Sequence, residues 1–338
     1  MKILYAVQGT GNGHVSRATE LLPVISRYAD VDVFLSGANC NLKLPFPVKY
    51  QSKGFSFSYT QSGSISNLKT LSQIAPFRLL KEIRELPVKD YDLVVNDFEF
   101  ISAWSARYHN VPSISLSHQA ALLSNRIPRP VSSGIVGRMI LSQYAPAPYS
   151  VGFHFQNYDD YIFTPVIRRE IRRLEPLKKG YFTVYLPAVG DRQLLAVLHE
   201  LNEVRWEVFS RTALHPYTEK NVSVLPAQNG EFLRSLENCN GLLTSAGFES
   251  PAEAMYLKKK LFVIPISGQY EQQCNAAALR EMGINTATRF TPEIIPQLSR
   301  WIHSYSSIDV HYPDISAQIV ETMLFDQQAF FLPALSAG

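Results

Sequence analysis

The chain alternates short, nearly continuous apolar runs with segments of helical periodicity, and this alternation restricts the fold more than any other feature. Runs that are apolar at successive positions form strands covered on both faces, which is typical of parallel sheets. Strands that alternate with helices indicate an α/β fold. The runs predicted as strands are residues 2–7, 31–35, 92–96 and 113–117 in the first half, and 182–186, 206–209, 222–225, 241–244 and 261–264 in the second.

The length of 338 residues predicts two domains, because one hydrophobic core seldom serves so long a chain. Residues 165–180 contain few apolar positions, two prolines and a closing glycine, and are predicted to connect the domains. We therefore expect a first domain at 1–164, a second at 181–310, and a helical tail at 311–338 whose helix returns to the first domain. Two Rossmann-like, doubly wound halves that face a cleft are the resulting prediction.

The composition narrows the class of protein. A net charge of +3 gives no support for nucleic-acid binding. Cys40, Cys239 and Cys274 lie far apart without a CxxC pair, so neither a zinc site nor a disulfide framework is indicated, and we expect a reducing cytoplasm. No apolar segment reaches the ~18 residues that a membrane-spanning helix needs, and the N-terminal residues lack the pattern of a signal peptide.

Two further stretches bear on possible partners. The run RREIRR at 168–173 is predicted to be a solvated helix face, with a contact to a diphosphate as the alternative. Residues 132–148 are apolar and slightly basic, which predicts an interior helix, with a contact to lipid as the alternative. Two locations are therefore compatible with the sequence: the cytoplasm, and the inner face of a membrane with peripheral contact.

Polar residues gather at the ends of four predicted strands. Because open parallel sheets bind ligands at the carboxyl ends of their strands, this shared position predicts one cleft lined by all four groups. The groups are QGTGNGH after the first strand, Asp97 after 92–96, TSAGFES at the end of 241–244, and SGQYEQQ after 261–264.

The first group has the composition of an anion-binding loop. Gly9, Thr10, Gly11 and Gly13 allow a tight turn and a close approach of backbone amides, although a plain strand-to-helix turn explains them too. His14 falls in the first turn of the following helix, where the partial positive charge favours a neutral ring that can accept a proton. A general base on an acceptor hydroxyl is the functional interpretation, and a structural histidine is the alternative.

Asp97 has two interpretations of equal weight. Its carboxylate suits the orientation of His14, and it also suits the N-cap of a helix that begins near Glu99. His118 and Gln119 follow the next predicted strand and are expected to line the same cleft, His118 beside the glycine loop of the first half.

The second half supplies further residues that suit a ligand with ribose and diphosphate groups. Ser250, with Pro251 next and Glu253 three residues on, forms a capping box, yet Glu253 would also be placed to accept hydrogen bonds from ribose hydroxyls. Ser245, Gly247 and the amides near Ser250 would donate to a diphosphate.

The last polar group, SGQYEQQ, lies at the end of the next predicted strand of the second half. Gln269, Glu271 and Gln272 begin a helix beside the last strand end. A carboxylate and amides together suit sugar hydroxyls, which both donate and accept hydrogen bonds. The alternative is an ordinary polar first turn.

The pair GFESPAEA and EQQCNA resembles the donor-site signature of GT-B glycosyltransferases of the UDP-glycosyltransferase superfamily, and GTGNGH is similar to the glycine loop of family 28. Family 28 includes a transferase that builds the lipid precursor of a cell-envelope glycan, peptidoglycan. The resemblance implies that Glu253 binds the donor ribose and that Glu271 and Gln272 bind the donor sugar. It also implies that His14 is the base, with Asp97 as a looser match to its partner.

Two departures from the signature stand out. Glu249 replaces the usual asparagine and adds negative charge near the expected phosphates. The strand at 182–186 is followed by LPAVGDRQ, where family 28 has a fuller glycine-serine loop, so that Gly190 retains only part of it.

The function expected from the resemblance is an inverting, metal-independent glycosyltransferase. It would use a nucleotide-diphospho-sugar, a UDP-sugar, as cosubstrate and no cofactor. The acceptor would be a lipid-linked or small-molecule glycan. Alternatives of the same fold are a hydrolysing nucleotide-sugar epimerase and a non-catalytic sugar-nucleotide sensor. A nicotinamide-dependent oxidoreductase fits least well, because His14 occupies the position of the last glycine of its fingerprint.

Overall fold

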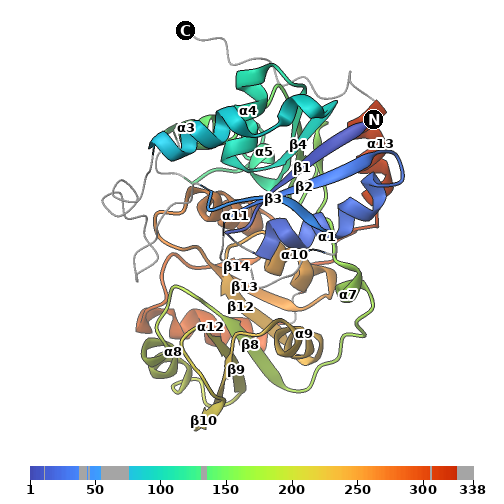
Figure 1. Cartoon of the computed structure of the whole chain (residues 1–338). Helices are drawn as coiled ribbons and strands as arrows, with labels where there is room; N and C mark the ends of the chain where they lie inside the picture. The colour runs from blue at the N-terminus through green and yellow to red at the C-terminus, as the bar shows by residue number, and fades with distance from the viewer. Residues whose placement is uncertain are drawn as a thin grey trace.

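The computed structural model describes residues 1–10, 12–37, 44, 46–54, 76–130, 135–304 and 307–325. Two seven-stranded sheets lie one above the other in Figure 1. The strands of the first sheet are β1 (Lys2–Gln8), β2 (Asp30–Ser36), β3 (Val48–Ser52), β4 (Leu93–Asp97), β5 (Ser113–Ser117), β6 (Tyr149–Phe153) and β7 (Ile162–Phe163). Those of the second are β8 (Tyr181–Tyr185), β9 (Arg205–Ser210), β10 (Tyr217–Glu219), β11 (Val222–Pro226), β12 (Gly241–Ser245), β13 (Lys260–Ile264) and β14 (Asn285–Thr286).

The two sheets share one topology. The first has the order β3-β2-β1-β4-β5-β6-β7 and is parallel throughout. The second has the order β10-β11-β9-β8-β12-β13-β14 and is parallel except for β10, which runs antiparallel to β11. In each sheet the first strand stands inside and the chain winds outward on both sides, which is the doubly wound arrangement of Rossmann-like folds. The fold class predicted from the sequence is confirmed.

Helices connect the strands and cover the sheets. They are α1 (Asn12–Ile25), α3 (Pro76–Glu85), η1 (Val88–Asp90), α4 (Phe100–His109), α5 (His118–Ala121), α6 (Ile135–Tyr144), α7 (Arg169–Arg172), α8 (Asp191–Leu198), α9 (Asn229–Asn238), α10 (Glu249–Tyr256), α11 (Tyr270–Glu281), η2 (Pro292–Ile294), α12 (Ile295–His303) and α13 (Ser316–Phe325).

Burial explains why the central strands could be predicted from their apolar sequence. Every residue of β1 from Ile3 to Val7 is fully buried, since helices cover both faces. The sequence did not indicate the strands β3, β6, β7, β10 and β14. β3 is an edge strand of sequence VKYQS, and β6 contains Gly152, where a Cβ would stand 2.9 Å from Ala121. A glycine in β6 therefore lets α5 pack closely on the sheet.

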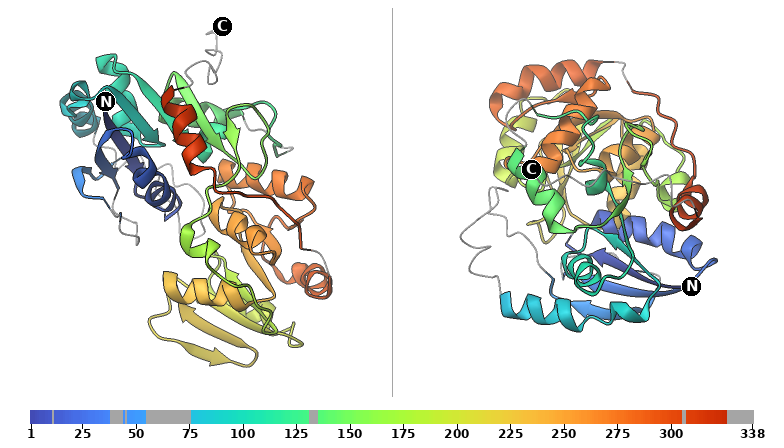
Figure 2. Two further views of the ribbon diagram at one scale, coloured as in Figure 1. Left: turned by 90° about the vertical axis from the view of Figure 1, so that its right-hand side faces the viewer. Right: turned by 90° about the horizontal axis from the view of Figure 1, so that it is seen from above.

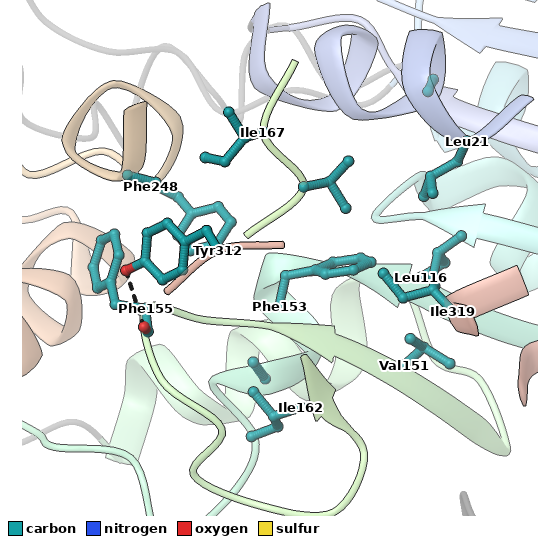
Figure 3. Close-up of a cluster of buried hydrophobic side chains, with 14 of the residues drawn as sticks. Leu21, Leu116, Val151, Phe153, Phe155, Ile162, Ile167, Phe248, Tyr312 and Ile319 are labelled. Carbon is teal, nitrogen blue, oxygen red and sulfur yellow. Dashed lines mark hydrogen bonds between the residues drawn. The ribbon is translucent and has the colours of Figure 1, made fainter. Parts of the chain in front are cut away.

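A continuous apolar cluster joins the two sheets (Figure 3). Phe155, just after β6, and Phe248, just before α10, have ring centroids 5.2 Å apart. Tyr312 donates from its hydroxyl to the Phe155 carbonyl at 3.0 Å. The halves therefore meet through packed side chains, and this contact fixes how their strand ends face each other.

The last described helix returns to the first sheet, as the sequence predicted. α13 packs against α1, as Figures 1 and 2 show, and Tyr28 donates to Glu321 at 2.8 Å. The chain crosses between the sheets twice, at 164–180 and again before α13. These crossings hold the halves together on the side where α1 and α13 pack.

The expectation of an interior helix within 132–148 is wrong. α6 lies at the surface, where Met139 is 60 % and Ile140 40 % exposed. Only one side of α6 packs inward, since a Cβ on Gly137 would overlap the ring of Tyr270 in α11. No helix in the described part of the chain has the length and apolar content to cross a membrane.

Candidate active site

The loop between β1 and α1 is shaped by contacts with the first sheet. Gly9 donates from its N–H to the Ser36 carbonyl at 2.6 Å, and a Cβ on Gly9 would stand only 3.1 Å from that oxygen. Thr10 accepts a hydrogen bond from Gln8 Nε2 at 3.0 Å. Gly11 lies outside the described residues. Packing alone therefore accounts for the glycine at position 9.

The start of α1 meets the start of α10 from the second half (Figure 1). α1 begins at Asn12, so both Gly13 and His14 belong to its first turn. A Cβ on Gly13 would stand 2.9 Å from Cγ of Glu249. The glycine at position 13 permits this close approach between the two halves.

His14 and Asp97 form the pair that the sequence suggested. His14 Nδ1 lies 2.7 Å from Asp97 Oδ1, and because a carboxylate only accepts, Nδ1 is the donor. Arg17, which the sequence analysis missed, binds the same carboxylate with Nε at 3.0 Å and Nη2 at 2.7 Å. His14 Nε2 has no hydrogen-bond partner among the described residues and is the ring nitrogen that can accept a proton.

The alternative role of Asp97 as a helix cap is wrong. The N-cap of α4 is Glu99, whose carboxylate accepts from the N–H groups of Ile101 at 2.9 Å and Ser102 at 2.6 Å. Asp97 is therefore free to bind His14 and Arg17.

The charge of Asp97 is stabilised in a buried place. Burial disfavours the ionised form, but the Arg17 guanidinium and the His14 ring outweigh it and hold the pKa of Asp97 below its ordinary value. Burial also disfavours the Arg17 cation, yet the carboxylates of Asp97 and Glu249 raise its pKa above the usual range. Asp97, held by Arg17, is thus an ionised acceptor in a fixed position for the hydrogen bond from the His14 imidazole.

Phe98 carries backbone strain beside this carboxylate. Its φ of 55° lies in the left-handed region, which a bulky residue seldom adopts. Its ring stacks on His14 at 6.4 Å between centroids and on Tyr144 at 4.6 Å. Strain of this kind persists where surrounding contacts require it and is frequent next to functional groups.

Glu249 reaches the same cluster from the second half. Its Oε1 accepts from Arg17 Nη1 at 3.0 Å, and its side chain is 23 % exposed. Burial raises the pKa of Glu249 to about 7; the cation of Arg17 opposes this, and the charges of Glu253 and Asp97 add to it. Glu249, which replaces the asparagine of the family signature, therefore places a carboxyl group with a pKa of about 7 in this cluster.

Glu253 is paired with Arg168, which corrects two predictions. Arg168 donates from Nε at 2.5 Å and from Nη2 at 2.8 Å to the two carboxylate oxygens. Its side chain is only 12 % exposed, so the solvated face expected for the run at 168–173 is wrong for this residue. The capping box of Ser250 and Glu253 is wrong as well. α10 begins earlier, at Glu249, and its N-cap Phe248 makes no side-chain cap.

Two of the three predicted residues at the start of α11 form hydrogen bonds within the protein, and one of these bonds reaches the first half. Glu271 accepts from Gln119 Nε2 at 2.9 Å, so these two predicted residues meet across the halves. Gln272 Oε1 accepts from the N–H of Ile266 at 2.9 Å, and Gln269 is the N-cap residue of the helix without a side-chain cap. Contacts within the protein thus account for part of this polar first turn.

His118 does not line an open cleft as expected. It is buried between the halves, with Nδ1 2.7 Å from the Phe153 carbonyl and Nε2 2.9 Å from Asn275 Oδ1. Its ring stacks on Phe248 at 4.0 Å, and burial lowers the pKa of His118. These contacts make it part of the apolar junction between the halves.

A pocket of about 520 Å³ opens where the two halves meet at the starts of α1 and α10. Of the predicted residues, Gly13, Ser250 and Glu253 line it. Ser245, at the end of β12, and Gly247 are not among its described lining residues. The rest of the lining is Arg168 and Glu249, which the sequence associated with a diphosphate, and Asn12, Ser16, Tyr185, Phe209, Ala227, Gln228, Asn229 and Phe232, which it did not place there.

Other site types find less support in the described part of the chain. It contains no group of three or more His, Cys, Asp or Glu side chains placed to hold a metal ion. Cys239 and Cys274 are free and buried, and Cys40 lies outside the described residues.

The comparison with protein families decides the class. The model of "Glycosyl transferase family 1" matches residues 1–297. The chain belongs to this family. A protein of Methanosarcina mazei described as an uncharacterized glycosyltransferase is 22 % identical to this family 1 protein over 346 residues, with 89 % of each chain covered.

Solved structures with the same fold are also glycosyltransferases. The Streptomyces sp. SF2575 glycosyltransferase SsfS6, complexed with thymidine diphosphate, has a TM-score of 0.56 and 14 % identity, covering 95 % of this chain and 96 % of its own. Arabidopsis thaliana UGT89C1, complexed with UDP-L-rhamnose, has a TM-score of 0.56 and 15 % identity, covering 95 % and 92 %. This family 1 protein is therefore a glycosyltransferase with the GT-B fold.

Proposed function

We propose that this glycosyltransferase moves a sugar from a nucleotide-diphospho-sugar, a UDP-sugar, to an acceptor hydroxyl with inversion at the anomeric carbon. His14 is the general base, and neither a metal ion nor a cofactor takes part. The observation that carries the proposal is the hydrogen bond of 2.7 Å between His14 and buried Asp97, next to a pocket between the two halves.

The pocket offers matching chemistry for the nucleoside diphosphate part of the donor. The N–H groups at the starts of α1 and α10 suit the diphosphate, because helix N-termini attract anions. The rings of Phe209 and Phe232, 5.3 Å apart, offer an apolar surface for the base. Glu253 suits the ribose hydroxyls, and Arg168, which binds Glu253, lines the same pocket with a positive charge.

The proposed chemistry is a single displacement. His14 Nε2 takes the proton of the acceptor hydroxyl as its oxygen bonds to the anomeric carbon and the bond to the diphosphate breaks. Asp97 holds Nδ1–H and stabilises the imidazolium that forms. The helix N-termini stabilise the departing diphosphate. Attack from the face opposite the leaving group inverts the anomeric centre.

The proposal places the acceptor on the side of the first sheet, beside His14. A lipid-linked or small-molecule glycan is the proposed acceptor class. We also propose that the glycine loop between β1 and α1 has the same role as the similar loop of family 28 glycosyltransferases. The donor sugar is proposed to meet Glu271 and Gln272, where it would replace the contact of Glu271 with Gln119.

The proposal is tested by a thermal-shift screen of UDP-, GDP- and dTDP-sugars, with and without EDTA. At least one nucleotide sugar is expected to raise the melting temperature, and EDTA is expected to leave the shift unchanged. The stabilising donor is then incubated with and without glycan and lipid acceptors, and the anomeric configuration of the product is determined.

Each result of that incubation has a distinct meaning. Acceptor-dependent transfer with inversion supports the proposal. A new epimer formed from the donor alone would show an epimerase instead, and binding without turnover would show a sensor. If no nucleotide sugar stabilises the protein, the proposed donor site is wrong.

A further inference from the structure

Glu249 stands where two helix N-termini converge on the pocket. It is the first residue of α10, and Gly13 in the first turn of α1 lies so close that a Cβ there would be 2.9 Å from Glu249 Cγ. Both helix starts contribute to the pocket lining. Because helix N-termini attract phosphate groups, this carboxyl occupies the part of the pocket best suited to the donor diphosphate.

The charges around Glu249 disfavour its ionised form when a diphosphate is present. With Glu249 ionised, four carboxylates face two guanidinium groups, because Glu170 also binds Arg168, so the cluster carries two net negative charges before any ligand enters. A diphosphate adds two more negative charges. The groups of this cluster around Glu249 are Arg17 and His14 from α1, Asp97 from β4, Glu253 from its own helix, Arg168 from the segment before α7, and Glu170 of α7, which binds Arg168.

The protonated form resolves this conflict. A neutral carboxyl group has an O–H that donates a hydrogen bond, whereas a carboxylate only accepts and repels a phosphate. Burial already brings the pKa of Glu249 to about 7 without a ligand, and a diphosphate at hydrogen-bond distance raises it further. The remaining contact with Arg17 Nη1 at 3.0 Å uses a carbonyl-type oxygen and survives protonation.

Resting on the proposed function, we propose that Glu249 binds the donor diphosphate as a neutral carboxyl that donates to a phosphate oxygen, so that the site takes up one proton from solvent when the donor binds. The carboxyl of Glu249 thereby couples donor affinity to pH. No other carboxyl among the described lining residues has this position, because both oxygens of Glu253 are held by Arg168.

Calorimetric titration with UDP at pH 8 tests the proposal. The titration is run in HEPES and in Tris, whose ionisation enthalpies differ, so that the difference in observed enthalpy gives the number of protons taken up. The wild type is expected to take up close to one proton. Above pH 7 its affinity for UDP is expected to fall about tenfold per pH unit, as linkage requires for one proton.

The variant Glu249→Gln keeps the shape and a donor N–H but cannot titrate. It is expected to bind UDP without the proton uptake and with nearly constant affinity between pH 7 and 8.5. Any proton that UDP itself takes up appears in this variant too and is subtracted. Glu321→Gln removes a carboxyl on α13 outside the pocket, where Tyr28 binds it, and is expected to match the wild type.

The outcomes separate this inference from the proposed function. A wild type that binds UDP without proton uptake, or a folded Glu249→Gln variant with the same uptake, overturns the inference and leaves the donor site standing. A wild type that binds none of UDP, GDP and dTDP overturns the proposed function together with the inference. Thermal melting of Glu249→Gln shows whether that variant is folded.

Discussion

At the residue scale, His14, Asp97 and Arg17 form a unit in which each group restricts the next. Arg17 occupies both oxygens of Asp97, so the carboxylate has no freedom to rotate away from His14 Nδ1. Arg17 follows His14 by three residues and so lies on the same face of α1. That spacing was the signal that the sequence analysis overlooked.

Asp97→Asn tests the electrostatic part of this unit. Because the pKa of Asp97 is lower in the folded state, its charge stabilises the fold above the pKa of the unfolded chain, and this contribution is lost as pH falls toward the folded value. At pH 7 the variant is expected to lose about 3–5 kcal/mol of unfolding free energy, as when one partner of a buried ion pair is removed.

The measurement for Asp97→Asn is urea unfolding at several pH values from 7 down to 3.5. The difference from the wild type should narrow below about pH 4, where the unfolded carboxyl becomes protonated. Asp30→Asn, at an exposed residue, is the matched control and should stay within about 0.5 kcal/mol of the wild type. A difference that does not vary with pH would contradict this account.

At the element scale, the meeting of α1 and α10 is the contact that assembles the site. Gly13→Ala is expected to weaken it, because the new Cβ would stand 2.9 Å from Glu249 Cγ and 3.2 Å from its Oε1. Either Glu249 or the start of α1 must then move. We expect reduced UDP binding and a melting temperature below that of the wild type.

Gly230→Ala is the matched control for Gly13→Ala. Each glycine is the second residue of its helix and follows an asparagine, but a Cβ on Gly230 meets nothing within 4 Å. Alanine should raise helix stability by up to about 1 kcal/mol at Gly230. Equal stabilisation by the two substitutions would show that the contact between α1 and α10 imposes no restriction.

Elements with a strong local pattern could be predicted, and contacts between distant elements could not. The strand at 113–117 has the bounds that the sequence predicted, since each of its residues is buried. The capping box at Ser250 failed because Glu253 binds Arg168, a residue 85 positions earlier. The periodicity of a sequence predicts which face of a helix or strand is buried, but not which residue of a distant element it contacts. For that reason the sequence predicted a solvated Arg168 and not its ion pair with Glu253.

At the scale of the whole molecule, the apolar cluster in Figure 3 determines how the halves face each other. Phe248→Ala removes a buried ring that contacts His118 and Phe155 across the junction. We expect a loss of about 3–5 kcal/mol in unfolding free energy, as for other buried Phe→Ala changes. Urea unfolding followed by tryptophan fluorescence measures it.

The control for Phe248→Ala is Phe77→Ala in α3, where the ring is 87 % exposed. That change should alter stability by no more than about 0.5 kcal/mol. Similar losses in both variants would mean that the cluster does not hold the halves together.

The central claim is that His14 acts on the acceptor proton of a sugar-transfer reaction. Its most direct test is the rate of transfer by His14→Ala from the stabilising donor, with UDP binding measured in the same preparation and exposed His215→Ala as the control. We predict UDP binding close to that of the wild type, and transfer lowered by a factor of about 10²–10⁴, the usual contribution of a general base. A His14→Ala variant that transfers sugar at nearly the rate of the wild type would contradict the account.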